Sequence, residues 1–247
     1  MELYIIRHAQ SQNNEIWART GAEVGRFPDP ELTEVGLRQA DCVGQRFAEE
    51  NTAVTHAQPM MHNRHGYPLT HLYASLQTRA VQTGTAISKA IGLPLVAWED
   101  IHEWGGIYEI DEATKVHTGL PGPNRAYFEA RFPDFVLPDY LGDEGWWSRP
   151  HEERDVTVTR VRRFLGDLID RHGDTEDRVG LVTHGGFSAV LLSMLNNSFT
   201  ENNELDQEKQ VWFTHHNTAV SRINFGKDHY QFVYLNSVTH LPNELIT

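Results

Sequence analysis

Four basic side chains in this sequence are suited to binding an anion. Arg7 and His8 directly follow a short apolar run, Arg79 lies just after a second such run, and His184 directly follows a third. Arginine offers rigid, paired donors for phosphate oxygens, and a protonated imidazole adds another charged donor. If the fold brings these four groups together, the sequence predicts a site for a small tetrahedral anion such as phosphate.

The elements that must position these groups alternate between strands and helices. Apolar runs predict strands at Leu3–Ile6, His71–Ser75, Leu95–Trp98 and Val179–Thr183. Helical spacing predicts helices at residues 33–50, 78–91, 152–172 and 185–195, with a loop between the first strand and the first helix. This alternation is typical of a three-layer α/β/α sandwich with a mostly parallel central sheet, in which ligands bind at the carboxyl ends of the strands.

Local signals support several of these boundaries. Thr33 is a plausible N-cap, and Gly92 followed by Pro94 is a stop signal for the second helix. Alternating strands near 218–225 and 230–235 predict a hairpin that turns at 226–228. Gly185 and Gly186 would let backbone N–H groups approach an anion beside His184.

Two stretches interrupt the alternation. Residues 51–70 have no clear period and predict an irregular surface excursion, while residues 105–150 are rich in glycine, proline and aromatic residues, with one short helix expected at Asn124–Arg131. We expect a single domain spanning residues 1–247 that carries both insertions, the second being a cap over the substrate.

Two sets of residues in these insertions allow more than one interpretation. The aromatic residues of the second could line a pocket for an apolar leaving group, but for most of them a place in the insertion's own core is favoured; they are Trp104, Tyr108, Tyr127, Phe128, Phe132, Trp146 and Trp147. His56, His62 and His65 could bind a transition metal, but a solvated loop is favoured because no cysteine or paired carboxylate lies nearby. We therefore expect no metal site.

Composition excludes several classes of protein. A formal charge of −13 argues against a general nucleic-acid binder, and no apolar run is long enough to cross a bilayer, so we expect neither nucleic acid nor membrane as a partner. Cys42 is the single cysteine, which excludes an internal disulfide framework and a multi-thiolate metal site. The segment 1–7 is typical of a strand and not of a signal peptide, so a cytoplasmic location is expected.

Five ordered blocks carry a family resemblance. Residues 7–14, RHAQSQNN, resemble the Arg-His-Gly-x-Thr/Ser-x-x-Asn signature of the histidine phosphatase superfamily, also called the phosphoglycerate mutase-like family. The other blocks follow in order at residues 32–40 (LTEVG with Gln39-Ala40), 75–83 (SLQTRAVQT), 103–106 (Glu103 ahead of two glycines) and 183–186 (THGG). Residues 217–220 also resemble a late strand of the family.

The resemblance implies a phosphatase that works through a phosphohistidine, without metal or cofactor. His8 would be the nucleophile, Arg7, Arg79 and His184 would hold the phosphoryl oxygens, and Glu103 would act as general acid and then base. The substrate would be a small phosphorylated molecule. A phosphoglycerate mutase-like fold and a possible homodimer complete the expectation.

Some assignments stay open from the sequence. Glu99, Asp100 and Glu109 compete with Glu103 for the role of general acid. Ser11 and Asn14 could bind the phosphate or could merely stabilise a turn. Ala9 replaces the usual family glycine, which suggests that the backbone there does not need a glycine-only conformation, and Leu76 stands where the family often has proline.

Three functions fit the same residues. A phosphomonoesterase is favoured over a mutase or phosphotransferase, because mutases of the family carry a tryptophan where this chain has Asn13, and the dense basic substrate segment of mutases is not found in the insertion. The third alternative is a noncatalytic phosphate-binding or protein-interaction module. The presence of both His8 and Arg79 counts against it.

Overall fold

A central sheet of seven strands organises the protein. The computed structural model describes residues 1–49, 67–196, 211, 213–227 and 229–247. The strands are β1 (Glu2–Arg7), β2 (His71–Ala74), β3 (Leu95–Ala97), β6 (Phe135–Val136), β7 (Arg178–Thr183), β8 (Val220–Phe225) and β9 (Tyr230–Ser237). Their order is β6-β3-β2-β7-β1-β8-β9, in which the first five are parallel neighbours and β8 runs antiparallel to both β1 and β9. The expected mostly parallel α/β sheet is confirmed.

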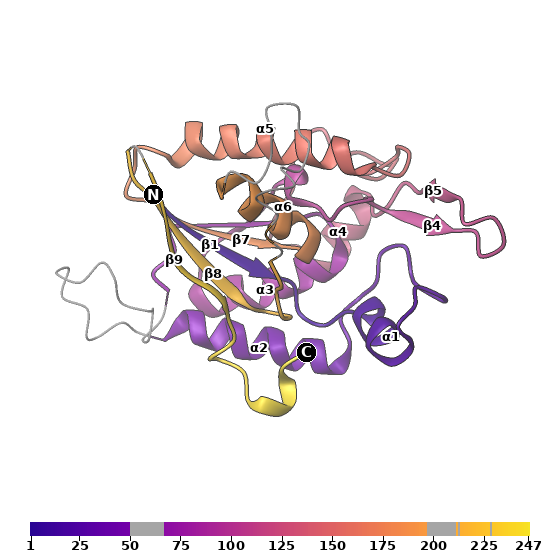
Figure 1. The fold of residues 1–247 in the computed structure, drawn as a ribbon, viewed down its shortest axis with the longest axis horizontal. Coiled ribbons are helices and arrows are strands. Elements are labelled where there is room, and N and C mark those ends of the chain that lie inside the picture. The colour runs from indigo at the N-terminus through magenta and orange to yellow at the C-terminus, as the bar shows by residue number, and fades with distance from the viewer. Residues whose placement is uncertain (50–66, 197–210, 212, 228) are drawn as a thin grey trace.

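Helices cover both faces of this sheet. α2 (Glu34–Ala48) and α3 (Thr78–Ile91) lie on one side, and α5 (Arg154–His172) and α6 (Gly185–Leu195) lie on the other (Figure 1). Within β1 the side chains alternate between the two layers: Leu3 and Ile5 pack with α5 and α6, whereas Tyr4 and Ile6 pack with α2 and α3. A strand with both faces covered must be apolar at every position, which is why this run does not alternate with polar residues.

The predicted helix boundaries have clear local causes. The Thr33 hydroxyl accepts a hydrogen bond from the N–H of Gly36 at 3.0 Å, so Thr33 is the N-cap of α2 as predicted. α3 ends at Gly92, whose φ of 71° is left-handed.

One helix near the site was not predicted. The segment after β1, expected to be a loop, contains α1 (Gln12–Thr20), which begins after a capping box formed by Ser11 and Asn14 and ends at the left-handed Gly21. None of its residues is buried, so it lacks the apolar stripe by which a helix is found in a sequence.

The second insertion joins the main sheet. It contains a small hairpin of β4 (Tyr108–Ile110) and β5 (His117–Gly119), the expected helix as α4 (Arg125–Arg131), and β6, which pairs with β3 at the sheet edge and was not predicted. Phe128, Trp146 and Trp147 are buried in the core on the α2–α3 side. These residues are buried as expected, but they belong to the main core shared with β1, α2 and α3 and not to a separate core of the insertion.

Other regions complete the description. Short 3₁₀ helices lie at η1 (Glu99–Ile101) and η2 (Asn243–Leu245). Most of the first insertion, including His56, His62 and His65, lies outside the described residues, as does one residue of the predicted hairpin turn. No helix within the described ranges is long and apolar enough to cross a membrane.

Candidate active site

Strand register brings the predicted site residues together. In the parallel pair of β1 and β7, Arg7 lies opposite Thr183, so His8 and His184 emerge from adjacent strand ends. The His8 N–H donates to the Thr183 carbonyl at 2.8 Å, and the two imidazole rings lie 5.1 Å apart. β2 pairs with the other side of β7, which places Ser75 beside the same edge.

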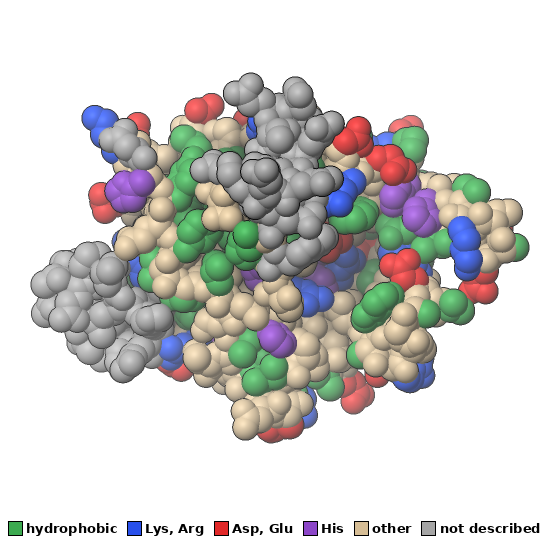
Figure 2. Space-filling view, viewed as in Figure 1, with side chains coloured by type: hydrophobic (Ala, Val, Ile, Leu, Met, Phe, Trp, Pro, Cys, Tyr) green, Lys and Arg blue, Asp and Glu red, His purple; other side chains and the backbone are tan. Residues whose placement is uncertain are grey.

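A cavity of about 230 Å³ opens at this edge. Arg7, His8, Arg79 and Glu103 line its floor, and α1, Trp104 and Tyr108 line its walls. A neighbouring cavity of about 540 Å³ shares Glu23 and Arg26 with it and extends along the β4–β5 hairpin. The surface is hollowed between this hairpin and α1, with charged side chains around the hollow (Figure 2).

His8 is held in one tautomer. Its Nδ1 lies 2.7 Å from the Ala9 carbonyl, which can only accept, so Nδ1 carries the proton. Nε2 therefore has a lone pair, and it accepts a hydrogen bond from Arg79 Nε at 3.2 Å. Burial lowers the pKa of His8 well below its ordinary value, and the charges of Arg79 and Arg7 lower it further. The imidazole is neutral at neutral pH, with its lone pair toward a cation.

Arg79 is buried and Arg7 is half-buried, and the two side chains are held by different partners. Arg7 donates through Nη1 to the His215 carbonyl, while its buried Nε has no hydrogen-bond partner among the described residues. Arg79 lies 3.8 Å from Asp29, whose carboxylate also accepts from the N–H and hydroxyl of Thr78. A buried guanidinium N–H without an acceptor is costly, which marks this position as one where an anion would be stabilised.

His184 lies behind the cavity floor. It is fully buried, and its Nε2 lies 2.9 Å from the Ser75 hydroxyl, while its Nδ1 has no partner among the described residues. Burial lowers the pKa of His184 well below its ordinary value, and the charge of Arg79 lowers it further. It is therefore neutral in this state of the site.

Glu103 is the carboxylate that points into the site. Its oxygens accept from the N–H groups of Gly186 and Phe187, each at 3.0 Å, at the N-terminus of α6. A Cβ at Gly186 would come within 2.5 Å of Glu103 Oε1, so the glycine permits this approach. The competing carboxylates lie elsewhere: Glu99 pairs with Arg149, Asp100 pairs with Arg163, and Glu109 lines the neighbouring cavity.

Ser11 and Asn14 serve the loop and also reach the cavity. Asn14 Oδ1 accepts from the Ser11 N–H and from Asn217 Nδ2, each at 3.1 Å, and Asn217 also donates to the His8 carbonyl at 2.9 Å. Ser11 and Asn14 also line the cavity wall. The structure therefore shows Ser11 and Asn14 stabilising the turn, and their role in binding phosphate stays a prediction.

The two departures from the family pattern have simple structural settings. The φ of Ala9 is not positive, so the backbone at this position does not need glycine, as the sequence suggested. Leu76 is fully buried in the core next to β2 and is not among the residues that line the cavity.

Four supporting residues were missed by sequence reasoning. Asp29, Ser75 and His215 hold Arg79, His184 and Arg7, and Gln77 accepts from the Glu103 N–H at 2.8 Å. Ser75 and Gln77 belong to a block already matched to the family, so their position offered a signal. Asp29 and His215 lie in irregular segments, where no sequence pattern indicated a role in the site.

The aromatic residues of the second insertion divide between two roles. Trp104 and Tyr108 line the cavity, and the Arg26 guanidinium lies 4.0 Å from the centre of the Tyr108 ring. Tyr127, Phe128, Phe132, Trp146 and Trp147 belong to the core or pack against it. One group that could hold a metal ion occurs among the described residues, and it lies outside this cavity.

Comparison with known proteins agrees with this geometry. The family model described as histidine phosphatase superfamily (branch 1) matches residues 3–238. A protein of Hydrogenobacter thermophilus, provisionally named phosphoserine phosphatase 2, is 26% identical, with 96% of each chain covered.

Solved structures show the same fold at low identity. A mycobacterial glucosyl-3-phosphoglycerate phosphatase is 16% identical with a TM-score of 0.56, covering 96% of this chain and 98% of its own. A phosphoserine phosphatase variant from Entamoeba histolytica, in complex with phosphoserine, is 17% identical with a TM-score of 0.52, covering 98% and 99%. With a family model matched over nearly its whole length, this chain belongs to the histidine phosphatase superfamily (branch 1).

Proposed function

We propose that the protein is a phosphatase that hydrolyses a small phosphomonoester through a phosphohistidine on His8. The observation that carries this proposal is the state of His8: a buried, neutral imidazole that lines the cavity and whose Nε2 lone pair accepts a hydrogen bond from Arg79 Nε. Neutral imidazole is a nucleophile, and an anion entering between it and the arginine would be attacked by Nε2.

The first step uses the cations of the cavity floor. Nε2 bonds to phosphorus as the ester P–O bond breaks. The phosphoryl oxygens accept hydrogen bonds from Arg79 and Arg7, including from Arg7 Nε, which has no partner within the part of the chain that the structure describes. Preorganised guanidinium groups stabilise the charge on the equatorial oxygens in the transition state. His184, adjacent to His8, would add a donor if it binds a proton along with the phosphate.

Glu103 would move the protons. In its protonated form it donates to the departing alkoxide oxygen, and its carboxylate then takes a proton from the water that attacks phosphorus and breaks the N–P bond. The N–H groups of Gly186 and Phe187 orient this carboxylate. The cycle ends with inorganic phosphate, the alcohol and neutral His8.

The leaving group would occupy the outer part of the cavity. Trp104 and Tyr108 of the second insertion and Arg26 of the loop after α1 line this region. We therefore propose that the insertion at 105–150 covers the substrate and selects its leaving group.

Trapping of the intermediate tests the mechanism. Rapid denaturing quench at alkaline pH, during turnover of ³²P-labelled phosphoserine, should label wild-type protein in the first turnover and leave His8→Ala unlabelled. With ³²P-labelled p-nitrophenyl phosphate, whose leaving group departs without a proton, Glu103→Gln should retain more label at steady state than wild type, because it slows attack by water. Turnover by wild type with no label in any time window would overturn the phosphohistidine, and phosphoryl return to an acceptor outrunning phosphate release would indicate a mutase.

A further inference from the structure

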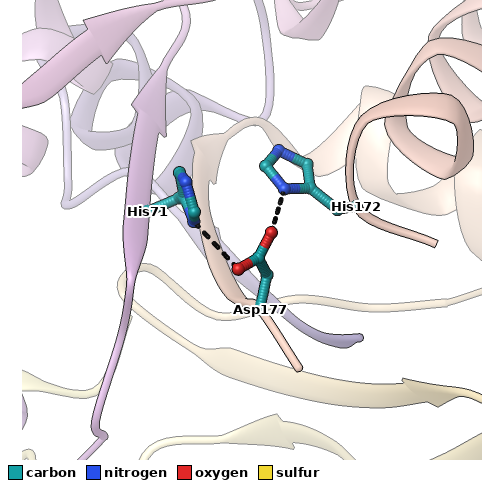
Figure 3. A group of neighbouring side chains, drawn as sticks. All are labelled: His71, His172 and Asp177. Atoms are coloured by element: carbon teal, nitrogen blue, oxygen red, sulfur yellow. Dashed lines mark hydrogen bonds and ion pairs between the residues drawn. The ribbon is translucent and has the colours of Figure 1, made fainter. Parts of the chain in front are cut away.

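A second cluster of histidines lies at the opposite edge of the same sheet. His71 begins β2, His172 ends α5, and Asp177 directly precedes β7, so three separate elements converge where the parallel strands start. Both imidazoles point toward the Asp177 carboxylate (Figure 3). None of these residues lines the cavity that holds His8.

From this arrangement we propose that His71, His172 and Asp177 form a binding site for a divalent transition metal of the zinc class. Two imidazole nitrogens and one carboxylate oxygen are a ligand set that such ions prefer, and three protein ligands leave a position for water. The two imidazoles come from distant parts of the chain and face the same carboxylate. A cation bound by all three groups would account for this arrangement.

The distances are close to those of a tetrahedral site. His172 Nδ1 lies 2.8 Å from Asp177 Oδ2, and His71 Nδ1 lies 3.8 Å from Asp177 Oδ1. Metal–ligand bonds of about 2.0–2.1 Å put tetrahedral ligand atoms roughly 3.3 Å apart, so the observed values lie on either side of the required one. The ligand atoms of all three residues lie within 4.8 Å of one another, so closure needs small side-chain rotations.

Neighbouring groups already hold the ligands in orientation. His172 Nε2 lies 3.2 Å from the Tyr73 hydroxyl, which leaves Nδ1 for the metal and fixes the ring. The Thr70 hydroxyl, 2.9 Å from His71 Nδ1, also lies 3.3 Å from the Arg178 carbonyl and can direct its proton there when Nδ1 binds an ion. Such outer contacts are typical of metal-binding histidines.

Charge and access also favour a cation. Burial differs across the site: His172 is 5% exposed, whereas the side chains of Asp177 and His71 are 26% and 39% exposed, which gives an ion a route from solvent. Among the described residues no lysine or arginine lies within ion-pair distance of Asp177.

Zinc titration of the tag-free, chelator-stripped protein tests the proposal. Isothermal titration against a competing chelator should show one tight equivalent of Zn²⁺ in wild type. We expect His71→Ala and Asp177→Asn to weaken it by more than about tenfold, while His117→Ala, at the β4–β5 hairpin, and His8→Ala keep it. Mg²⁺ should not compete, because it prefers oxygen ligands.

Two further measurements separate loss of metal binding from loss of folding and identify the ligands. Circular dichroism and thermal melting without metal show whether His71→Ala is folded, and Zn²⁺ should raise the melting temperature of wild type but not of this variant. X-ray absorption should find two imidazoles among the ligands. Equal Zn²⁺ affinity in wild type and His71→Ala, or loss of binding in His8→Ala alone, would overturn the proposal and leave the cluster as a hydrogen-bonded His–Asp–His group.

Discussion

Two histidine clusters at opposite edges of one sheet differ in the charge that each imidazole faces. At the carboxyl edge His8 lies beside Arg79 and Arg7, in a buried setting. At the amino edge His172 lies beside the Asp177 carboxylate, 2.8 Å away. β2 and β7 contribute to both edges, so the same strands position two different chemistries.

The charge beside each imidazole therefore decides which chemistry that imidazole can perform. A cation and burial keep the ring neutral and leave a lone pair for attack on phosphorus. A neighbouring carboxylate instead accepts a hydrogen bond from the ring N–H, or it binds the same metal ion as the ring. Substitutions at either edge, of an imidazole or of the charged group beside it, therefore test this comparison.

Removal of the nucleophile gives the largest effect. His8→Ala should lower kcat/KM for p-nitrophenyl phosphate by at least about 1000-fold, because no other group takes over covalent attack. His229→Ala, at the exposed β8–β9 turn, is the matched control and should keep wild-type turnover. Comparable activity of the two variants would show that the carboxyl edge is not the reacting site.

Replacement of the adjacent guanidinium comes next. Arg79→Lys keeps a positive charge but loses the paired donors, and kcat should fall by about 100-fold. Arg79→Ala also removes a charge that lowers the pKa of His8, so this pKa should rise. Activity is lost as pH falls through the His8 pKa, so the acidic limb of kcat/KM should move to higher pH in Arg79→Ala. An unmoved limb would mean that Arg79 does not control His8.

The effect of removing the general acid should depend on the leaving group of the substrate. Glu103→Gln should slow cleavage of an alkyl phosphate about 100-fold but slow the phosphorylation of His8 by p-nitrophenyl phosphate much less, since nitrophenolate departs without a proton. Single-turnover kinetics on both esters measures the difference. The same loss with both substrates would assign Glu103 a purely structural role at the start of α6.

Stability should respond to pH through the buried imidazoles. The pKa of His8 is lowered in the folded protein, so the unfolded chain binds a proton first as pH falls below about 6.5. The free energy of unfolding should therefore fall with pH, by about 1 kcal/mol per buried neutral histidine between pH 6.5 and 5.5. Urea unfolding of wild type and His8→Asn should show a loss that is smaller by that amount in the variant. Parallel curves would contradict the lowered pKa.

The amino edge should give the smallest effect, which is also lost as pH falls but over a more acidic range than that of the buried histidines. With metal chelated, Asp177→Asn should lower the free energy of unfolding at pH 7 by about 0.5 to 1 kcal/mol, since the partly exposed pair is screened by solvent. Because the pKa of Asp177 is lowered, its contribution is present above about pH 4 and is lost as pH falls through the folded value. A difference between wild type and variant that stays constant below pH 4 would argue against this pair.

The strand ends and the residue types of the site could be predicted from the amino-acid sequence. β1 and β7 are buried on both faces, so they appear as unbroken apolar runs, and the residue that follows each is the histidine of interest. Ordered blocks around Arg79 and Glu103 then indicated the family. α1, β6 and the supports Asp29 and His215 left no such signal, because they are short, exposed or irregular.

Which of these groups lie in contact, and in which protonation state, follows only from the packed fold. The register of β1 against β7 brings His8 beside His184, and helix α6 offers its N-terminal N–H groups to Glu103 and not to Glu99 or Asp100. The His71, His172 and Asp177 cluster likewise joins residues about a hundred positions apart. Burial and neighbouring charge depend on all packed elements together, so no local pattern can fix the pKa of His8 or reveal the second cluster.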